Sequence, residues 1–249
     1  MKQILFIHTY NSPFIRRDLK VLQEEFSVED LDLSGMKQNI IGKVITIYKI
    51  ASRIPKNSVT FVWFADFRAF VSVILGKLFR RKVVVVVGGY ELAKFPQYNY
   101  GALLTKFGAW RVKQILKLAT KILAVDDSLK LDAENLLKKE LNSIITIPTG
   151  YDSLKFFANE KKQDLVLTVA VVASENKAKL KGLEAFIAVA KLLPNIQFMI
   201  IGISDEAYDW VMLRKTENLT ILPKISEENL LEYYQKAKVY CQLSCREGL

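Results

Sequence analysis

The stretch Lys82–Val87 reads KVVVVV, a strand-like run with no polar residue in alternation, and it constrains the fold more than any other segment. β-branched residues favour strands, and a strand that is apolar on both sides must be buried on both faces of its sheet. The same combination, a short apolar run followed by a longer helical pattern, recurs along the whole chain. This alternation predicts an α/β protein built from parallel, doubly wound sheets.

The predicted elements fall into two groups. In the first group we expect strands at Ile4–Ile7, Val28–Leu33, Val59–Phe64, Lys82–Val87, Ile122–Val125 and Ile144–Ile147. The helices between them are expected at Arg16–Glu25, Asn39–Arg53, Phe67–Phe79, Gly101–Ala119 and Ser128–Glu140. In the second group we expect strands at Leu165–Val172, Gln197–Ile201, Leu219–Leu222 and Lys238–Leu243. Its helices are expected at Gly182–Leu193, Glu206–Lys215 and Glu227–Lys236.

A break in the pattern separates the two groups. Pro148, Gly150 and a polar run at 159–164 are typical of a linker. We therefore expect two Rossmann-like domains with a cleft between them, residues 1–150 and 163–249, joined by a linker at 151–162. The second domain holds 87 residues and closes on a strand, so it is expected to be incomplete.

Composition narrows the class of protein. The two cysteines, Cys241 and Cys245, do not make a disulfide framework, and with a single histidine in the chain no metal site is expected. Charged residues interrupt the longest apolar runs before they reach the roughly 18 residues of a membrane span. No signal peptide is recognisable, so we expect a cytoplasmic protein.

The excess of positive charge lies in the first part of the chain. Residues 1–150 hold 23 Lys+Arg against 13 Asp+Glu, whereas residues 151–249 hold 13 of each. This asymmetry indicates either an anionic partner, such as a membrane surface, or a solubilising surface. There is no nucleic-acid-binding motif or cluster of stacking aromatics, so nucleic acid is not expected as a partner.

Part of the basic excess is ordered along the predicted helix Gly101–Ala119. At 100° per residue Lys106, Lys113 and Lys117 fall within about 40° of one another, with Trp110 about 20° beyond them. Phe107, Ile115 and Leu118 are expected to face the core. A basic ridge with one aromatic suits anionic lipid head groups, and the alternative is a solvated helix face.

Three motifs resemble those of family 4 glycosyltransferases, which have the two-domain GT-B fold. IPTGYDSLKFF resembles the interdomain linker of that family, and LTVAVVASENKAKLKGLEAFIAVAKLLPNIQFMIIG resembles its nucleotide-sugar segment. LLEYYQKAKVYCQLSCREGL resembles the stretch that enters the family's Glu-x7-Glu motif, of which only the first glutamate is present, as Glu247. The resemblance covers residues 80–249 by motif and the first 80 by topology, and implies a glycosyltransferase truncated at its C-terminus.

The resemblance implies roles for residues of the second half. Glu247 corresponds to the glutamate that contacts the donor sugar and is a catalytic candidate. Lys181 and Gly182 precede a helix, where a lysine and free backbone N–H groups can bind a diphosphate. Two further donor-binding candidates follow: Gly202 is expected to approach the donor from its strand end, and the Lys224–Ile225 backbone is expected to border the base.

Residues of the first half are expected at the cleft. Gly88 and Gly89 end the valine strand and would turn the chain into the cleft, presenting Tyr90 and Glu91 to a ligand. His8 ends the first strand and is either a catalytic contact or a satisfied strand-end histidine. The sequence departs from the family in having no histidine after the valine strand and Ala173–Ser174 in place of a Gly-Arg phosphate clamp, which Lys177 or Lys179 would have to replace.

The resemblance implies a retaining glycosyltransferase that moves a sugar from a nucleotide-sugar donor to a glycan, lipid or saccharide hydroxyl without a metal. Because of the basic ridge, we expect the protein to bind peripherally to the inner face of the membrane. The alternative is a non-catalytic remnant that only binds a sugar nucleotide or a surface. An NAD-dependent oxidoreductase is disfavoured because no G-x-G-x-x-G follows the first strand of either half.

Overall fold

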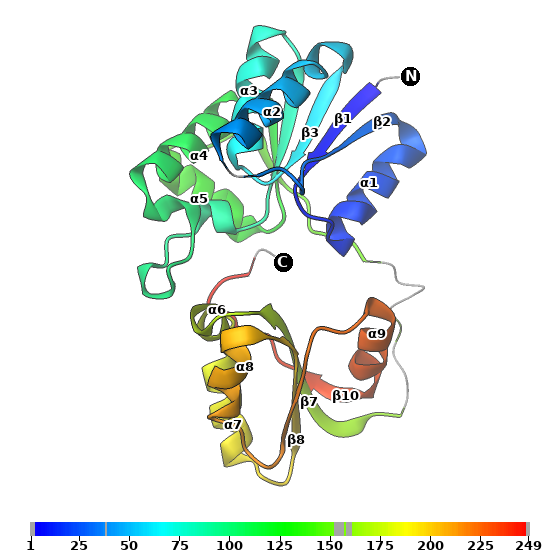
Figure 1. Ribbon diagram of the computed structural model, residues 1–249, viewed down its shortest axis with the longest axis vertical. Coiled ribbons are helices and arrows are strands. Elements are labelled where there is room, and N and C mark those ends of the chain that lie inside the picture. The colour runs from blue at the N-terminus through cyan, green and yellow to red at the C-terminus, as the bar shows by residue number, and fades with distance from the viewer. Residues whose placement is uncertain (1–2, 38, 152–156, 158–160, 248–249) are drawn as a thin grey trace. The chain divides into compact units, whose positions relative to one another are not determined.

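The computed structural model describes residues 3–37, 39–151, 157 and 161–247 (Figure 1). The chain divides into two compact units: the N-terminal unit holds residues up to 96 and 100–150, and the C-terminal unit holds residues 97–99 and 151–247. Within the described residues no helix is long and apolar enough to cross a membrane.

The N-terminal unit is built on a parallel sheet in the order β2-β1-β3-β4-β5-β6. Its strands are β1 (Gln3–His8), β2 (Ser27–Asp32), β3 (Val59–Trp63), β4 (Lys82–Val87), β5 (Lys121–Ala124) and β6 (Ile144–Thr146). Its helices are α1 (Pro13–Glu25), α2 (Ile40–Ala51), α3 (Phe67–Leu78), α4 (Lys106–Leu118) and α5 (Asp127–Leu137). Its 3-10 turns are η1 (Ile54–Lys56), η2 (Tyr90–Leu92) and η4 (Ala102–Leu104), and the turn η3 (Pro96–Tyr98) lies between η2 and η4 in the sequence.

The strand order places a topological switch point between β1 and β3. Connections that run in opposite directions along a parallel sheet cover opposite faces, because the crossovers are right-handed. Helix α1 accordingly lies on one face and α2 to α5 lie on the other (Figure 1). The expected burial of the valine strand on both faces is confirmed, since Val83, Val85, Val86 and Val87 are all buried.

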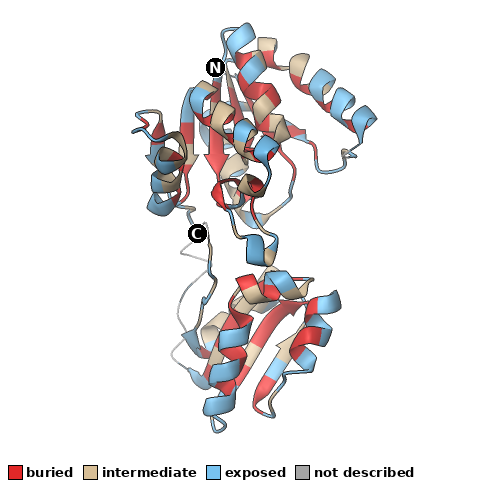
Figure 2. Cartoon of the chain, turned by 90° about the vertical axis from the view of Figure 1, so that its left-hand side faces the viewer, coloured by how far each residue is buried: buried red, intermediate tan, exposed pale blue. Residues whose placement is uncertain are grey.

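The C-terminal unit has a parallel sheet in the order β10-β7-β8-β9, with its switch point between β10 and β7. The strands are β7 (Gln163–Val172), β8 (Gln197–Ile203), β9 (Leu219–Leu222) and β10 (Ala237–Tyr240). The helices are α6 (Glu175–Leu180), α7 (Leu183–Leu192), α8 (Asp205–Met212) and α9 (Glu227–Lys236). Figure 2 shows buried residues gathered along the strands of both units.

Two apolar clusters cover the faces of this second sheet. Phe186 of α7 and Trp210 of α8 pack with Phe198 on one face. Tyr233 and Tyr234 of α9 pack against Leu167 on the other. The two inner strands, β7 and β8, are thus buried between these clusters. They position the loops that follow them.

Several expected elements have different bounds in the structure, and three of the differences concern segments near candidate residues. The helix expected from Gly101 begins at Lys106, because Gly101 adopts φ 118° and the side chain of Thr105 accepts the Gly108 N–H at 3.0 Å as an N-cap. The segment before Lys181, expected as a loop, contains α6. The last strand ends at Tyr240 and not at Leu243, and its register with β7 is irregular.

Candidate functional site

The carboxyl edge of the C-terminal sheet brings together the sequence-predicted residues of the second half. In a parallel sheet all strands end at the same edge, and ligands bind there at the switch point. Lys181 and Gly182 follow β7 through α6, and Glu247 lies in the segment after β10. Because β7 and β10 flank the switch point, these residues meet where the topology predicts a ligand.

Lys181 and Glu247 form an ion pair in which the lysine Nζ lies 2.5 Å from the glutamate Oε1. The same oxygen accepts hydrogen bonds from Gln242 Nε2 and Ser244 Oγ, each at 2.5 Å. Both charged side chains are a little over one quarter exposed, 29% for Lys181 and 26% for Glu247. The pair is thus partly desolvated yet accessible, which is the setting in which a lysine can exchange one anionic partner for another.

Gly182 is held in the left-handed region, with φ 71°. A Cβ built on it would lie 2.0 Å from the Leu243 carbonyl oxygen, so only glycine lets the segment after β10 pack here. The Cys245 N–H donates to the Leu180 carbonyl at 2.8 Å beside it. The close backbone approach expected at Gly182 is made by the chain itself, and it is this contact that carries Glu247 toward Lys181.

Gly202 serves the packing of two strands. It lies within β8 at φ 110°, and a Cβ there would be 2.7 Å from the carbonyl oxygen of Ala170 in β7. The register between these strands shifts from Val169 to Val172, beside this contact. Its location is therefore inside the strand, next to a bulge, and its role in donor binding remains a prediction.

The remaining donor-side residues occupy neighbouring loops. Lys224 is exposed in the loop between β9 and α9, whereas Ile225 packs in the cluster under α9. Of the lysines considered as a second phosphate clamp, Lys179 is paired with Glu175 at 2.7 Å. Lys177 is exposed.

His8 ends β1 and is buried. Its Nε2 lies 3.1 Å from Asp30 Oδ1, and its Nδ1 lies 3.1 Å from the Tyr10 carbonyl oxygen. Both ring nitrogens thus have partners within the N-terminal unit, as in the alternative of a satisfied strand-end histidine. A catalytic role for His8 remains a prediction.

The loop after β4 was expected to present Tyr90 and Glu91 to a ligand, and for Glu91 this is wrong. Tyr90 is half exposed, but Glu91 is buried. The Glu91 carboxylate accepts backbone N–H groups of Ala65 at 3.1 Å, Gly88 at 3.4 Å and Gly89 at 3.0 Å. The carboxylate thereby joins the loop after β3 to the loop after β4, because it accepts three backbone N–H groups that would otherwise lack a partner.

This environment makes Glu91 sensitive to pH. Burial raises the pKa of its carboxyl above the ordinary 4.5, and the backbone N–H donors oppose that shift only in part. The folded unit therefore keeps a proton that the unfolded chain releases, and this stabilisation is present below pH 4.5 and is lost as pH rises through the raised pKa.

We expect the difference in unfolding free energy between wild type and Glu91→Gln to decrease as pH rises above about 4.5, the ordinary value. Urea unfolding of both proteins across a pH series measures it. Glu24→Gln, at an exposed glutamate of the same unit, controls for the removal of a carboxylate. A difference that stays constant or increases with pH would contradict the assignment.

Sequence reasoning did not identify an aromatic group at the carboxyl edge of the N-terminal sheet. The ring centroids of Phe14 and Trp63 are 5.0 Å apart, those of Trp63 and Phe64 are 5.4 Å apart, and Tyr10 meets Phe64 edge-on at 5.7 Å. A recess of about 40 Å³ lies among Phe14, Trp63, Phe64, Gly88, Val125 and Thr149. The aromatic residues of two segments could have indicated this group. NSPF follows β1 and VWFAD includes the end of β3, and these two strands flank the switch point.

Phe64 is the strained member of this group. Its φ is 72°, a conformation that bulky side chains rarely adopt and that costs on the order of 1–3 kcal/mol. Gly88 lies against it, because a Cβ on Gly88 would be 2.9 Å from the Phe64 ring. Strain of this kind is concentrated at functional sites. The residues that line the aromatic recess are therefore further candidates for a functional site.

The basic ridge expected on the helix after Gly101 lies on α4. Lys106 and Lys117 are exposed, Trp110 is 46% exposed and Lys113 is half-buried. Phe107 was expected to face the core, and this is wrong, since it is 63% exposed and its ring stacks on Trp110 at 5.7 Å. Beginning the helix at Lys106 places Phe107 in its first turn, clear of the sheet.

Among the residues that the structure describes, no three His, Cys, Asp or Glu side chains come together in a way that could hold a metal ion.

The fold is similar to those of solved structures. Anabaena HepE in complex with UDP and glucose matches with a TM-score of 0.69 and 12% identity, over 98% of this chain and 74% of HepE. Sucrose-phosphate synthase from Thermosynechococcus elongatus matches with a TM-score of 0.72 and 12% identity, over 100% of this chain and 77% of the synthase. UDP-GlcNAc 2-epimerase from Methanocaldococcus jannaschii matches with a TM-score of 0.59 and 10% identity, over 96% of this chain and 78% of the epimerase.

At the level of sequence, no protein-family model and no curated protein matches the chain. The similarity is therefore one of architecture, and it extends over nearly the whole chain. It agrees with the two parallel, doubly wound sheets and with the motifs of the second half. The chain has the GT-B fold.

Proposed function

We propose that this protein transfers a sugar from a nucleotide-sugar donor to an acceptor hydroxyl, with retention of configuration at the sugar. The observation that carries the proposal is the Lys181–Glu247 pair at the switch point of the C-terminal sheet. The fold adds support, since HepE was solved with UDP and glucose.

In the proposed reaction the bond between the anomeric carbon and the diphosphate oxygen breaks, and the acceptor oxygen forms a bond to the same carbon. The acceptor proton passes to the leaving diphosphate. Charge develops on the diphosphate, and Lys181 Nζ together with the first N–H groups of α7 would stabilise it. Glu247 would leave Lys181 and accept hydrogen bonds from the donor sugar. No metal takes part in this scheme.

The acceptor side is proposed for the N-terminal unit. Beside the aromatic recess at its switch point, Tyr10 is 63% exposed and meets Phe64 edge-on, and its ring offers a surface on which a sugar or an apolar acceptor group can stack. A glycan or lipid-linked saccharide would suit this surface. A lipid-linked acceptor would be met at an anionic membrane surface, which the exposed Lys106, Trp110 and Lys117 of α4, with Lys113 beside them, would contact.

We expect Lys181→Ala to weaken UDP binding by about tenfold or more, because a charge-assisted hydrogen bond to phosphate contributes roughly 1.5–3 kcal/mol. Isothermal titration calorimetry with UDP measures it. Lys191→Ala, at an exposed lysine of α7 outside the carboxyl edge, is the matched control and should bind as wild type does. Equal affinities for Lys181→Ala and wild type would remove Lys181 from the site.

A second candidate is a binding module without turnover, which the Ala173–Ser174 pair in place of Gly-Arg favours. Incubation with UDP-sugars and saccharide acceptors separates the two functions. Transfer to an acceptor supports the glycosyltransferase, and it should persist in the presence of EDTA. UDP binding without product supports the module, and conversion of UDP-GlcNAc to an epimer would overturn both.

A further inference from the structure

Helix α2 exposes its apolar face to solvent. The side chains of Ile40, Ile41, Val44 and Tyr48 are 80%, 69%, 59% and 72% exposed, and Ile45 and Ile47 are each 41% exposed. At 100° per residue these six residues, which we call the α2 arc, fill a continuous arc of about 160°. Only Gly42, Thr46 and Ile50 are buried on the opposite side. A surface helix normally shows the reverse pattern.

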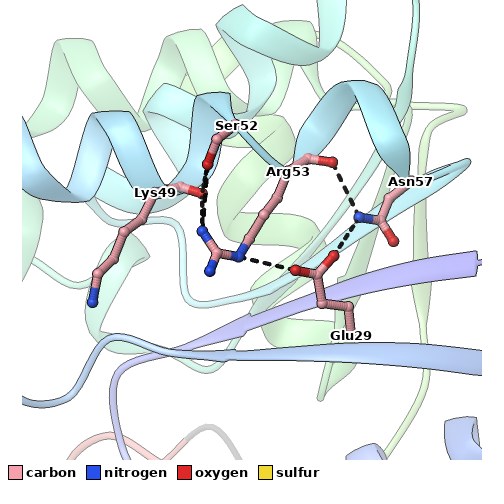
Figure 3. Close-up of polar contacts among 5 residues, drawn as sticks. All are labelled: Glu29, Lys49, Ser52, Arg53 and Asn57. Atoms are coloured by element: carbon pink, nitrogen blue, oxygen red, sulfur yellow. Dashed lines mark hydrogen bonds and ion pairs between the residues drawn. The ribbon is translucent and has the colours of Figure 1, made fainter.

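The helix is fixed in this orientation at both ends. Asn39 caps its first turn through a side-chain hydrogen bond. At its end Arg53 Nε lies 2.9 Å from Glu29 of β2, and Asn57 donates to the same carboxylate at 2.8 Å (Figure 3). Arg53 also donates to the Lys49 carbonyl at 2.9 Å. The α2 arc is therefore exposed in a helix that is anchored to the sheet.

Lysines border the α2 arc on both sides. Lys43 is exposed and lies about 40° beyond Ile47 around the helix, and Lys49 lies about 40° beyond Ile45. The Lys49 ammonium points away from the Arg53–Glu29 contact (Figure 3). An apolar arc with lysines at its edges is typical of a helix that lies in a membrane interface, where the ammonium groups reach the head-group phosphates.

The chain segments around α2 carry an excess of positive charge. Residues 33–125, which contain α2, α3 and α4, hold 16 Lys+Arg and only two acids. Of these two, Glu91 is buried and Asp66 caps α3 and pairs with Arg68 at 2.9 Å. The part of this face formed by α2, α3 and α4 therefore carries an excess of positive charge, whereas the exposed Asp127 of α5 lies on the same face.

A basic recess lies at the end of α3, and one of its lining residues contacts the turn that follows α2. It has a volume of about 250 Å³, and the charged residues among its lining are Lys77, Arg80, Arg81 and Lys82. Arg81 Nη2 donates to the Pro55 carbonyl at 2.7 Å, in the turn that follows α2. Leu78, next to the recess in sequence, is 70% exposed. The recess can hold a phosphate, and its neighbour Leu78 is apolar.

We propose that α2 docks the protein on an anionic membrane surface, with the α2 arc entering the boundary between head groups and acyl chains and the basic recess holding a lipid phosphate. A second copy of the chain is a poorer occupant, because a two-fold contact would bring two positive faces together. The proposal does not depend on the transfer reaction, so either can fail alone.

Sedimentation with vesicles tests the proposal. Wild type should bind vesicles of phosphatidylcholine and phosphatidylglycerol, and binding should weaken with salt. Ile41→Glu/Val44→Glu in the α2 arc should weaken binding about tenfold or more, and Lys77→Glu/Arg80→Glu at the recess should abolish the preference for anionic over pure phosphatidylcholine vesicles. Leu192→Glu/Leu213→Glu, at exposed leucines of the C-terminal unit, is the matched control and should bind as wild type does.

The opposite outcomes overturn the proposal. It is wrong if wild type stays in the supernatant, or if the Ile41→Glu/Val44→Glu variant binds vesicles as tightly as wild type does. Light scattering identifies the other occupant: a wild-type dimer that this variant converts to a monomer, with vesicle binding unchanged, would assign the α2 arc to a second copy. Binding of inorganic phosphate at the basic recess without vesicle binding would contradict membrane docking and would assign the recess to free phosphate. Circular dichroism checks that each variant is folded.

Discussion

Gly182→Ala is expected to destabilise the C-terminal unit and to separate Glu247 from Lys181. The left-handed conformation costs an alanine about 1–2 kcal/mol, and its Cβ would lie 2.0 Å from the Leu243 carbonyl oxygen. The segment after β10 must then move, which removes the hydrogen bond from the Cys245 N–H to Leu180, worth about 1 kcal/mol. The total loss is about 2–3 kcal/mol.

Hydrogen exchange of the β7 and β8 amides measures this loss within the C-terminal unit, and UDP titration measures the separation of the pair. Gly35→Ala is the matched control, because a Cβ there has no neighbour within 4 Å and the position is not in the left-handed region. Unchanged protection in β7 and β8 together with unchanged UDP affinity would show that the close approach at Gly182 does not hold the segment.

Glu247→Gln is expected to lower turnover with a UDP-sugar without weakening the binding of UDP. The substitution keeps the size of the side chain but removes the carboxylate that holds Lys181 at 2.5 Å. Lys181 is then free to bind a diphosphate, so UDP affinity should stay the same or increase. Turnover with a UDP-sugar should fall about 100-fold, because a partner of the donor sugar in the transition state is weakened.

Calorimetry with UDP and a transfer assay make the two measurements, and Glu217→Gln, at an exposed glutamate of the same unit, is the control. A fall in UDP affinity as large as that of Lys181→Ala would mean that Glu247 supports the phosphate site instead of competing for its lysine. Turnover equal to that of wild type would remove Glu247 from the catalytic residues.

The fold was readable from the sequence because it rests on local patterns. Val83–Val87 could only be a doubly buried strand, and the alternation of strand and helix patterns required parallel sheets. Helix ends were less predictable, as at Gly101, where a positive φ and a threonine cap four residues further on decided the start of α4. Such boundaries depend on which hydrogen bonds the surrounding chain leaves available.

The candidate site was predictable only in part. Lys181 and Glu247 were predicted from motifs that resemble those of family 4 glycosyltransferases, and the structure brings the two side chains together at one sheet edge. The sequence did not show why position 182 must be glycine, because the neighbour that requires it, Leu243, is distant in sequence. Glu91 was misjudged for the same reason, because its partner Ala65 belongs to another strand end.

The sequence by itself determined the α/β class, the two groups of elements and the segments that end at each sheet edge, since hydrophobic period and turn residues act locally. Only the tertiary structure decided which side chains are exposed. The six apolar residues of the α2 arc look like core in the sequence, but just Gly42, Thr46 and Ile50 fit against the sheet. Burial depends on which face of a helix the rest of the fold covers, and no local pattern records that choice.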